Sequence, residues 1–314
     1  MQNGAMFCFM KKIITHKNLH REINTIDDLC RMLSLEKYFL QKHIRLCPLL
    51  YIEIPLKKKD GTPRPIRAPK DKLKIIQRAI LKNILSGIKL PSCCYGFSKN
   101  KSIIENAKVH SKNDFLLNLD IQDFFPSVHY KKVQQIFLDI GLSEEIAIIL
   151  CGLTTYEYRL PQGAPTSPFL ASFALSNLDY RLMRLAKSNY LTYTRYFDDI
   201  SFSGNKRVVV LEKDIMKIIK EEGYTVKISK RKLFTKNEAK EVNGVLITNK
   251  KLSLRNTDEL FNYVSDINKY GLSKLQTDNL EKERQSLKGK IAFLKQVDQE
   301  QSDKIEAIFT SILW

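Results

Sequence analysis

Tyr193-Thr194-Arg195-Tyr196-Phe197-Asp198-Asp199-Ile200-Ser201-Phe202-Ser203 is the stretch that decides the fold of this chain. Two runs rich in aromatic and β-branched residues, 190–197 and 200–202, flank its pair of adjacent aspartates. Such residues favour strands, so the stretch predicts a β-hairpin with Asp198 and Asp199 at its tight turn. Taken alone, an Asp-Asp pair is more often a solvated turn than a functional site.

A carboxylate earlier in the chain changes that interpretation. Residues 115–119 form an apolar run that ends at Asp120. One carboxylate at the end of a strand and two in a neighbouring hairpin can converge on divalent metal, and hard oxygen ligands suit Mg²⁺. Two such ions can activate a 3′-hydroxyl and stabilise departing pyrophosphate. The pattern therefore indicates a nucleotidyl-transferring polymerase.

Composition bounds the class of partner. The 314 residues are 43% hydrophobic, enough for a core and for two or three subdomains. Lys and Arg outnumber Asp and Glu by 52 to 34, and the net charge of +18 favours a polyanion such as nucleic acid. No apolar run approaches the roughly 20 residues that span a bilayer, and no signal peptide is apparent. We expect a cytoplasmic protein without a membrane partner.

The cysteines and histidines predict neither a zinc site nor a disulfide framework. The six cysteines form no C-x-x-C pair, and the five histidines are scattered along the sequence. We therefore expect a reduced protein whose metal chemistry rests on carboxylates.

The region 51–69 predicts a basic hairpin. Residues 51–56 alternate as a strand, Asp60-Gly61 marks the turn, and the returning run 63–69 carries three prolines, which places it at a sheet edge. Its cationic side chains can close over a nucleotide triphosphate, or they can form a solvated basic turn.

A proline-rich loop precedes a long predicted helix. In residues 160–168, Ser167 is a good N-cap and Pro168 a good first helical residue. The apolar positions of 169–185 then recur at helical spacing and predict core packing. Fixed prolines around Gln162 and Gly163 allow this loop to approach a base pair closely.

Together, these motifs resemble the reverse transcriptases in type and in order from about residue 51 to 254. The family carries a Tyr-x-Asp-Asp box, here 196–199, an upstream aspartate, here Asp120, and a Pro-Gln-Gly turn, here 161–163. The resemblance implies an RNA-directed DNA polymerase with an α+β right-hand fold of fingers, palm and thumb. The expected divisions are an N-terminal helical extension (1–50), fingers (51–115), palm with interleaved fingers segments (116–254) and helical thumb (255–314).

The resemblance also implies the roles of individual residues. Asp120, Asp198 and Asp199 are expected to be catalytic and to hold two Mg²⁺ ions, which Mn²⁺ can replace, with the Ile121 carbonyl as an extra ligand. The side chains expected to contact the incoming deoxynucleotide are Lys58, Arg64, Phe125, Gln162 and Lys232. Phe125 matches the position where the family places an aromatic ring against the 2′ face of the sugar; the alternative is a core residue.

Two further boxes narrow the resemblance to bacterial retron reverse transcriptases. Residues 106–110 match their Asn-Ala-x-x-His box, and 242–244 match their Val-Thr-Gly box except at Asn243. Phe197 is another departure, because bacterial enzymes usually have alanine there. The residues expected to contact RNA or template-primer are Asn106, His110, Tyr196, Phe197 and Asn243. The alternative for Asn106 and His110 is that they brace the palm.

The retron resemblance implies specific partners and products. Such enzymes bind a cognate structured noncoding RNA of the msr-msd type, prime from a guanosine 2′-hydroxyl within it, and copy part of it into multicopy single-stranded DNA. They commonly act in phage defence with a separate effector protein. The alternatives are another prokaryotic defence or group II intron-like reverse transcriptase, and an inactive RNA-binding homologue.

Overall fold

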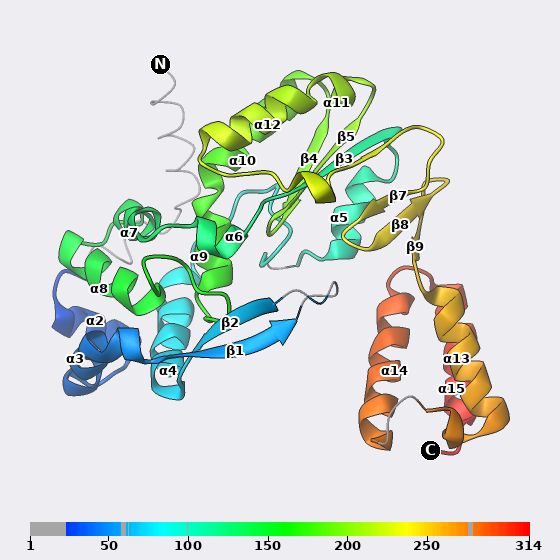
Figure 1. The fold of residues 1–314 in the computed structure, drawn as a ribbon, viewed down its shortest axis with the longest axis horizontal. Coiled ribbons are helices and arrows are strands. Elements are labelled where there is room, and N and C mark those ends of the chain that lie inside the picture. The colour runs from blue at the N-terminus through cyan, green and yellow to red at the C-terminus, as the bar shows by residue number, and fades with distance from the viewer. Residues whose placement is uncertain (1–22, 58–60, 62, 99, 276–278) are drawn as a thin grey trace.

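A four-stranded antiparallel sheet, called the central sheet here, lies in the middle of the chain (Figure 1). The structure is a computed structural model that describes residues 23–57, 61, 63–98, 100–275 and 279–314. The strand order is β4-β5-β3-β6. The strands are β3 (Phe115–Asp120), β4 (Thr192–Tyr196), β5 (Asp199–Gly204) and β6 (Lys232–Phe234).

The predicted hairpin around the two aspartates is confirmed. Strands β4 and β5 pair from Thr192 opposite Ser203 to Tyr196 opposite Asp199. The turn therefore consists of Phe197 and Asp198, while Asp199 is already the first residue of β5. A two-residue turn of this kind fixes the register of the strands, because their side chains alternate between the two faces.

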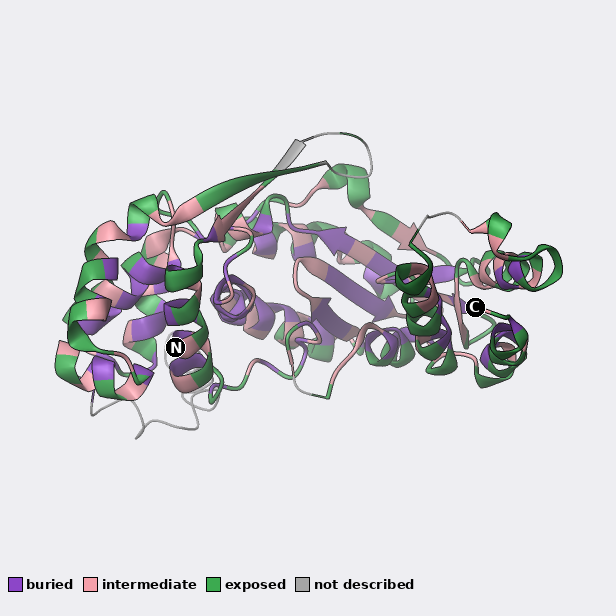
Figure 2. Ribbon diagram, turned by 90° about the horizontal axis from the view of Figure 1, so that it is seen from below, coloured by how far each residue is buried: buried purple, intermediate pink, exposed green. Residues whose placement is uncertain are grey.

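Each face of the central sheet packs against a different core, and its strands are coloured largely as buried in Figure 2. Leu117 and Leu119 of β3 point into the largest apolar cluster, together with residues of α10 (Ser176–Ser188) and α12 (Glu212–Glu221). The intervening Leu116 points the other way, into a cluster with α5 (Ile103–His110). This alternation follows from the period of two along a strand.

The second cluster joins α5 to a small three-stranded sheet that follows the central sheet in sequence. Its order is β7-β8-β9, and apolar residues of α5 pack against β7 and β8. The turn between β7 and β8 is formed by Asn243 and Gly244. The strands are β7 (Lys240–Val242), β8 (Val245–Thr248) and β9 (Lys251–Leu254).

The basic region near the N-terminus forms the predicted hairpin of β1 (Tyr51–Lys57) and β2 (Pro63–Pro69). It docks on the proline-rich loop, because the Arg67 amide donates to the Gln162 carbonyl at 2.9 Å. Gly163 lies against Ile66 so closely that a Cβ at 163 would stand 2.6 Å from the Ile66 side chain. Helices cover the base of this hairpin: α2 (Ile26–Leu33), α3 (Lys37–Leu46) and α4 (Asp71–Ile80).

Helices also fill the sequence between β3 and β4. The predicted long helix at 169–185 is interrupted at Leu175, so that α9 (Ser167–Ala174) and α10 are separate. Thr166, which the sequence did not single out, holds the N-cap position in place of Ser167 and makes no side-chain cap bond. The remaining helices of this stretch are α6 (Phe124–Ser127), α7 (Tyr130–Asp139) and α8 (Glu144–Thr154).

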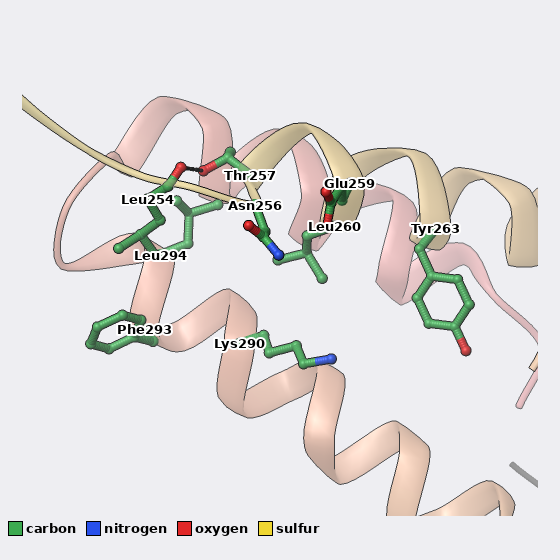
Figure 3. A pocket seen from close by; sticks show the side chains of 9 residues that line it. All are labelled: Leu254, Asn256, Thr257, Glu259, Leu260, Tyr263, Lys290, Phe293 and Leu294. Atoms are coloured by element: carbon green, nitrogen blue, oxygen red, sulfur yellow. Dashed lines mark hydrogen bonds between the residues drawn. The ribbon is translucent and has the colours of Figure 1, made fainter. Parts of the chain in front are cut away.

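Three helices at the C-terminus form a unit with its own core. They are α13 (Thr257–Tyr270), α14 (Leu280–Lys295) and α15 (Gln299–Ser311). Their shared cluster is separate from the other two and includes Val264, Leu287, Ile291 and Phe309. A cavity of about 350 Å³ opens between α13 and α14, lined by residues such as Tyr263, Lys290 and Phe293 (Figure 3). Within the described residues, no helix combines the length and apolar character needed to cross a membrane.

Candidate active site

The three predicted catalytic aspartates meet at one end of the central sheet. Asp120 is the last residue of β3 and lies opposite Asp199, the first residue of β5, in the antiparallel register. Opposed residues of such a pair have Cα atoms about 5 Å apart. Asp198 lies in the adjoining turn, and its carbonyl accepts a hydrogen bond of 3.1 Å from the Ile121 amide. Strand pairing therefore brings together carboxylates that lie almost 80 positions apart in sequence.

The site carries an excess of negative charge. Burial, and then the neighbouring charges of Asp198 and Asp120, raise the pKa of Asp199 to about 7. The Lys230 ammonium bonds to Asp120. Burial disfavours that ammonium, but the bond to Asp120 and the charges of Asp198 and Asp199 outweigh burial and raise the pKa of Lys230. The Lys230 ammonium thus lies at the position where the three carboxylates attract positive charge.

These donors fit a divalent cation in kind. The three side chains are hard anionic oxygen ligands, which is the chemistry that Mg²⁺ and Mn²⁺ prefer. As the side chains of the described residues stand, no three acidic, histidine or cysteine groups are gathered closely enough to hold a metal. The Lys230 ammonium pairs with the Asp120 carboxylate and supplies the positive charge that a metal ion would otherwise supply. Ile121 is buried beside Asp120, and its amide, rather than its carbonyl, makes the contact to the turn.

A buried ion pair, which the sequence did not reveal, supports the catalytic turn from behind. Arg195 of β4 is fully buried and bonds both carboxylate oxygens of Asp179 on α10, at 2.7 and 2.9 Å. The same guanidinium donates to the carbonyls of Phe197 in the turn (2.9 Å) and Ser172 on α9 (3.0 Å). The sequence does hold one indication of this ion pair: Arg195 lies inside a strand whose other residues favour burial, and a buried charge requires a partner.

The turn has an unusual backbone at Phe197. Its φ of 54° is in the left-handed region, which a bulky side chain rarely adopts. The chain segment at 93–96 runs beside the turn: the Arg195 amide donates to the Cys93 carbonyl at 2.8 Å, and the Arg195 carbonyl accepts from the Tyr95 amide at 2.7 Å. A Cβ at Gly96 would stand 2.8 Å from the Phe197 nitrogen, so only glycine fits there. Tyr196 and Phe197 are both half-buried, and their RNA or primer contact stays a prediction.

The structure describes some, but not all, of the residues expected to contact the nucleotide. Gln162 is half-buried in the proline-rich loop under the β1-β2 hairpin. Phe125 follows the Asp120 strand, half-buried with its ring centroid 5.4 Å from that of Phe124, and it also contacts the main core. Lys232 is exposed, and its ammonium lies 3.1 Å from Glu241. Lys58 lies outside the described residues, as does the side chain of Arg64.

Asn106 and His110 require a correction. Both are fully buried. The two ring nitrogens of His110 bond the hydroxyls of Ser203 (2.6 Å) and Thr194 (2.7 Å), so the imidazole bridges β5 and β4. Burial lowers the pKa of His110 to about 3, and the ring is neutral at physiological pH. The direct RNA contact expected of these two side chains is not retained, because protein surrounds them: His110 bonds β4 and β5, and Asn106 bonds Asn243.

Asn243 lies close to the catalytic carboxylates rather than on an outlying surface. Its Nδ2 donates to Asp199 Oδ2 at 3.0 Å, and its Oδ1 accepts from Asn106 Nδ2 at 2.6 Å. The two boxes that carry the retron resemblance therefore contact each other, and Asn243 links them to Asp199.

The raised pKa of Asp199 predicts a pH-dependent cost in the metal-free protein. A carboxyl whose pKa is higher in the folded than in the unfolded chain stabilises the fold at low pH, and that contribution is lost as the pH rises from about 4 to about 7. Asp199→Asn cannot ionise. Without metal, we expect the free energy of unfolding of this variant to exceed that of wild type by about 2 kcal/mol at pH 8. This figure is about half of the free energy that corresponds to the pKa difference, because solvent screens a partly exposed group.

Urea unfolding in chelator at pH 5 and pH 8 measures this difference. Asp123→Asn is the control, because Asp123 is exposed and not paired with the central sheet. A variant-minus-wild-type difference that does not grow between the two pH values would contradict the electrostatic assignment.

Comparisons with known proteins agree with the geometry. A family model described as "Reverse transcriptase (RNA-dependent DNA polymerase)" matches residues 56–264. The chain is 33% identical over 236 residues to the Retron Ec86 reverse transcriptase of Escherichia coli, covering 74% of each protein. It is 31% identical to the Retron Mx65 reverse transcriptase of Myxococcus xanthus, covering 81% of this chain and 63% of that protein.

A further retron relative and a solved structure also match this chain. The Retron Mx162 reverse transcriptase of Myxococcus xanthus is 32% identical, with 63% of this chain and 47% of that protein covered. The chain thus spans between about half and three quarters of these three relatives. Among solved structures, a telomerase from Candida albicans aligns with a TM-score of 0.49 at 12% identity, covering 84% of this chain and 57% of that one.

The family match spans the strand that ends at Asp120, the hairpin at Asp198 and Asp199 and the small sheet, which confirms the expected α+β polymerase fold. The named relatives that share this region are retron enzymes. This chain therefore belongs to the reverse transcriptase family, as a retron reverse transcriptase and an RNA-directed DNA polymerase.

Proposed function

We propose that this polymerase copies part of a cognate structured noncoding RNA into multicopy single-stranded DNA, from a 2′-hydroxyl primer within that RNA. The observation that carries the proposal is the pairing of Asp120 with Asp199 beside the Asp198 turn. In the proposed reaction, the carboxylates of Asp120, Asp198 and Asp199 hold Mg²⁺, for which Mn²⁺ can substitute. The metal, when bound, activates the primer hydroxyl and stabilises the departing pyrophosphate.

The chain's own residues orient the two substrates. The β1-β2 hairpin, with Lys58 and Arg64, closes over the triphosphate, and the Gln162 loop supports the new base pair from beneath. The backbone hydrogen bond between Arg67 and Gln162 holds these two parts together. Lys232, next to the metal-binding end of the sheet, adds a cation on the nucleotide side.

Two observations support an RNA partner: the net charge of the chain and its similarity to retron reverse transcriptases. A net charge of +18 favours binding to a phosphate backbone, and the named relatives are reverse transcriptases of retrons. In this proposal β1-β2 belongs to the fingers, the central sheet to the palm, and α13 to α15 form the thumb. We further propose that the DNA product and a separate effector protein act in anti-phage defence in the cytoplasm.

The test is to sequence the nucleic acid that copurifies with the full chain expressed from its native locus. We expect one structured RNA joined through a 2′-hydroxyl to DNA complementary to part of it. Unjoined DNA copied from unrelated RNAs would favour an intron-like enzyme, and RNA without any DNA would favour an inactive binding protein. Phage plating with and without Asp199→Asn then tests the defence role.

Phe125 is expected to exclude ribonucleotides. It follows Asp120 by five residues, and its half-buried ring packs against Phe124 at the edge of the main core. A ring at the 2′ face rejects a hydroxyl by shape. Phe125→Val should raise ribonucleotide incorporation at least tenfold relative to deoxynucleotide, measured as the ratio of kcat/KM values in primer extension (about 1.4 kcal/mol).

The control for this substitution is Phe124→Leu, since Phe124 is buried in the main core. It should lower stability with no change in sugar selection. If Phe125→Val behaves in the same way, Phe125 is a core residue and not the sugar gate.

A further inference from the structure

A chain of two side-chain amides ends on a catalytic carboxylate. Asn106 Nδ2 donates to Asn243 Oδ1 at 2.6 Å, and Asn243 Nδ2 donates to Asp199 Oδ2 at 3.0 Å. The three residues come from α5, the β7-β8 turn and β5, and Asn106 and Asn243 are 137 positions apart in sequence. We call this chain the amide relay.

Electrostatics fix the direction of the amide relay. An ionised Asp199 only accepts hydrogen bonds, so Asn243 must turn its NH₂ group toward it. The Asn243 carbonyl then faces Asn106, which must in turn present its own NH₂ group. The opposite orientation of either amide would set two oxygens against each other.

The relay leaves one buried atom unsatisfied. Asn106 is fully buried, and its Oδ1 has no hydrogen-bond partner among the described residues. A buried acceptor without a donor lowers the stability of the fold, so a buried asparagine contributes less to stability here than an apolar residue of its size. A polar group kept at that cost is explained by what its other end does, which is to orient Asn243.

The foundation of the relay is rigid. Helix α5 is capped by Ser102, whose side chain accepts from the Glu105 amide. One turn after Asn106, His110 clamps the hydroxyls of Ser203 and Thr194 on the strands of the catalytic hairpin. Asn243 adopts φ 49°, a left-handed turn conformation that asparagine tolerates better than most residues. The helix therefore grips the hairpin at its middle and, through Asn243, at its catalytic end.

We propose that Asn243 and Asn106 are positioning residues that hold the Asp199 carboxylate in its metal-binding orientation, with α5 as their platform. Residues behind a metal ligand commonly set that ligand's orientation, and their loss weakens metal affinity 10–100-fold. The proposal rests on the proposed function, because it assigns Asp199 as a metal ligand. It gives the two boxes of the retron resemblance a role in building the active site.

The test uses the full chain and four variants. Asn243→Gly removes the amide and suits a left-handed turn. Asn106→Leu removes the distal donor at similar volume. Asn249→Gly is the matched control, because Asn249 has φ 51° in the neighbouring β8-β9 turn and is exposed. The fourth variant combines the substitutions at 243 and 106. Mn²⁺ affinity is measured by equilibrium titration of the RNA-free protein, alongside extension of a generic annealed primer and RNA affinity.

We expect Asn243→Gly to weaken Mn²⁺ binding at least tenfold and to lower the extension rate at limiting Mg²⁺, with recovery at high Mg²⁺. The KM for deoxynucleotide and the affinity for RNA should stay within twofold of wild type. Asn106 acts only through Asn243, so Asn106→Leu should have a smaller effect and add nothing in the combined variant. Asn249→Gly should match wild type in every measurement.

Other results would overturn the relay. Unchanged Mn²⁺ affinity in Asn243→Gly would do so, whatever the loss of extension. Weakened RNA binding with normal Mn²⁺ affinity would return Asn243 to RNA recognition. Additive losses from 106 and 243 would show independent roles. A wild-type chain that binds no Mn²⁺ and extends no primer would instead remove the proposed function, and the relay with it.

Discussion

Asp199→Asn is expected to lower DNA synthesis at least a thousandfold, about 4 kcal/mol in activation free energy, while RNA affinity stays unchanged. The substitution keeps the shape of the side chain but removes one of the three charges that meet at the end of the central sheet. Metal binding depends on that charge, whereas RNA binding depends on the many cations spread over the surface. Single-turnover primer extension and filter binding on the same preparation measure the two effects.

The control for this experiment is again Asp123→Asn. Asp123 lies three residues after Asp120, is exposed, and begins the short helix α6 rather than extending the strand. Its substitution should change the rate less than threefold. Robust synthesis by Asp199→Asn, or an equal loss in Asp123→Asn, would remove Asp199 from the metal site.

Arg195→Met should be the most destabilising single substitution in the palm, costing about 3–5 kcal/mol in free energy of unfolding. The change leaves the Asp179 carboxylate buried without its cation and takes a donor from each of two carbonyls, those of Phe197 and Ser172. Burial disfavours the charged guanidinium, but Asp179 outweighs that effect and raises the pKa of Arg195 well above its usual value, so the guanidinium keeps its charge at every practical pH. Denaturant unfolding measures the loss.

Removing both charges separates stability from catalysis. In Arg195→Met with Asp179→Leu, no buried charge is left alone, so we expect most of the lost stability to return. The Phe197 carbonyl still lacks its donor, and the Asp198-Asp199 turn is held less firmly. DNA synthesis should therefore remain at least tenfold below wild type. Full recovery of synthesis in this variant would confine Arg195 to a structural role.

The meeting of the three carboxylates could be predicted from the sequence, although Asp120 is far from Asp198 and Asp199 along the chain. Asp120 ends an apolar run, and Asp198 and Asp199 interrupt another, so strand pairing alone brings them together. The hairpin, the α5 cap at Ser102 and the C-terminal helices follow from local patterns of the same kind.

The partners of the site could not be predicted in this way. Asp179 meets Arg195 across 16 positions, Lys230 meets Asp120 across 110, and Asn106 meets Asn243 across 137. Each is one polar residue in a segment whose pattern is set by burial, and polarity alone does not say which distant group it faces. The aromatic and β-branched residues of 224–228 favour a strand, but the segment makes a single bridge through Val226, because the chain turns into a 3₁₀ helix at Ile228.

The separate core of α13, α14 and α15 has a consequence for how this polymerase diversifies. The three helices bury their apolar faces chiefly against one another and meet the small sheet through Leu254 and Phe293. Amide hydrogens in them should exchange as one block, at a lower opening free energy than those of the central sheet. A unit that unfolds alone can also be replaced alone. Chimeras joined between Leu254 and Thr257 should keep the central sheet and its three aspartates intact, so this unit can change in sequence without disturbing them.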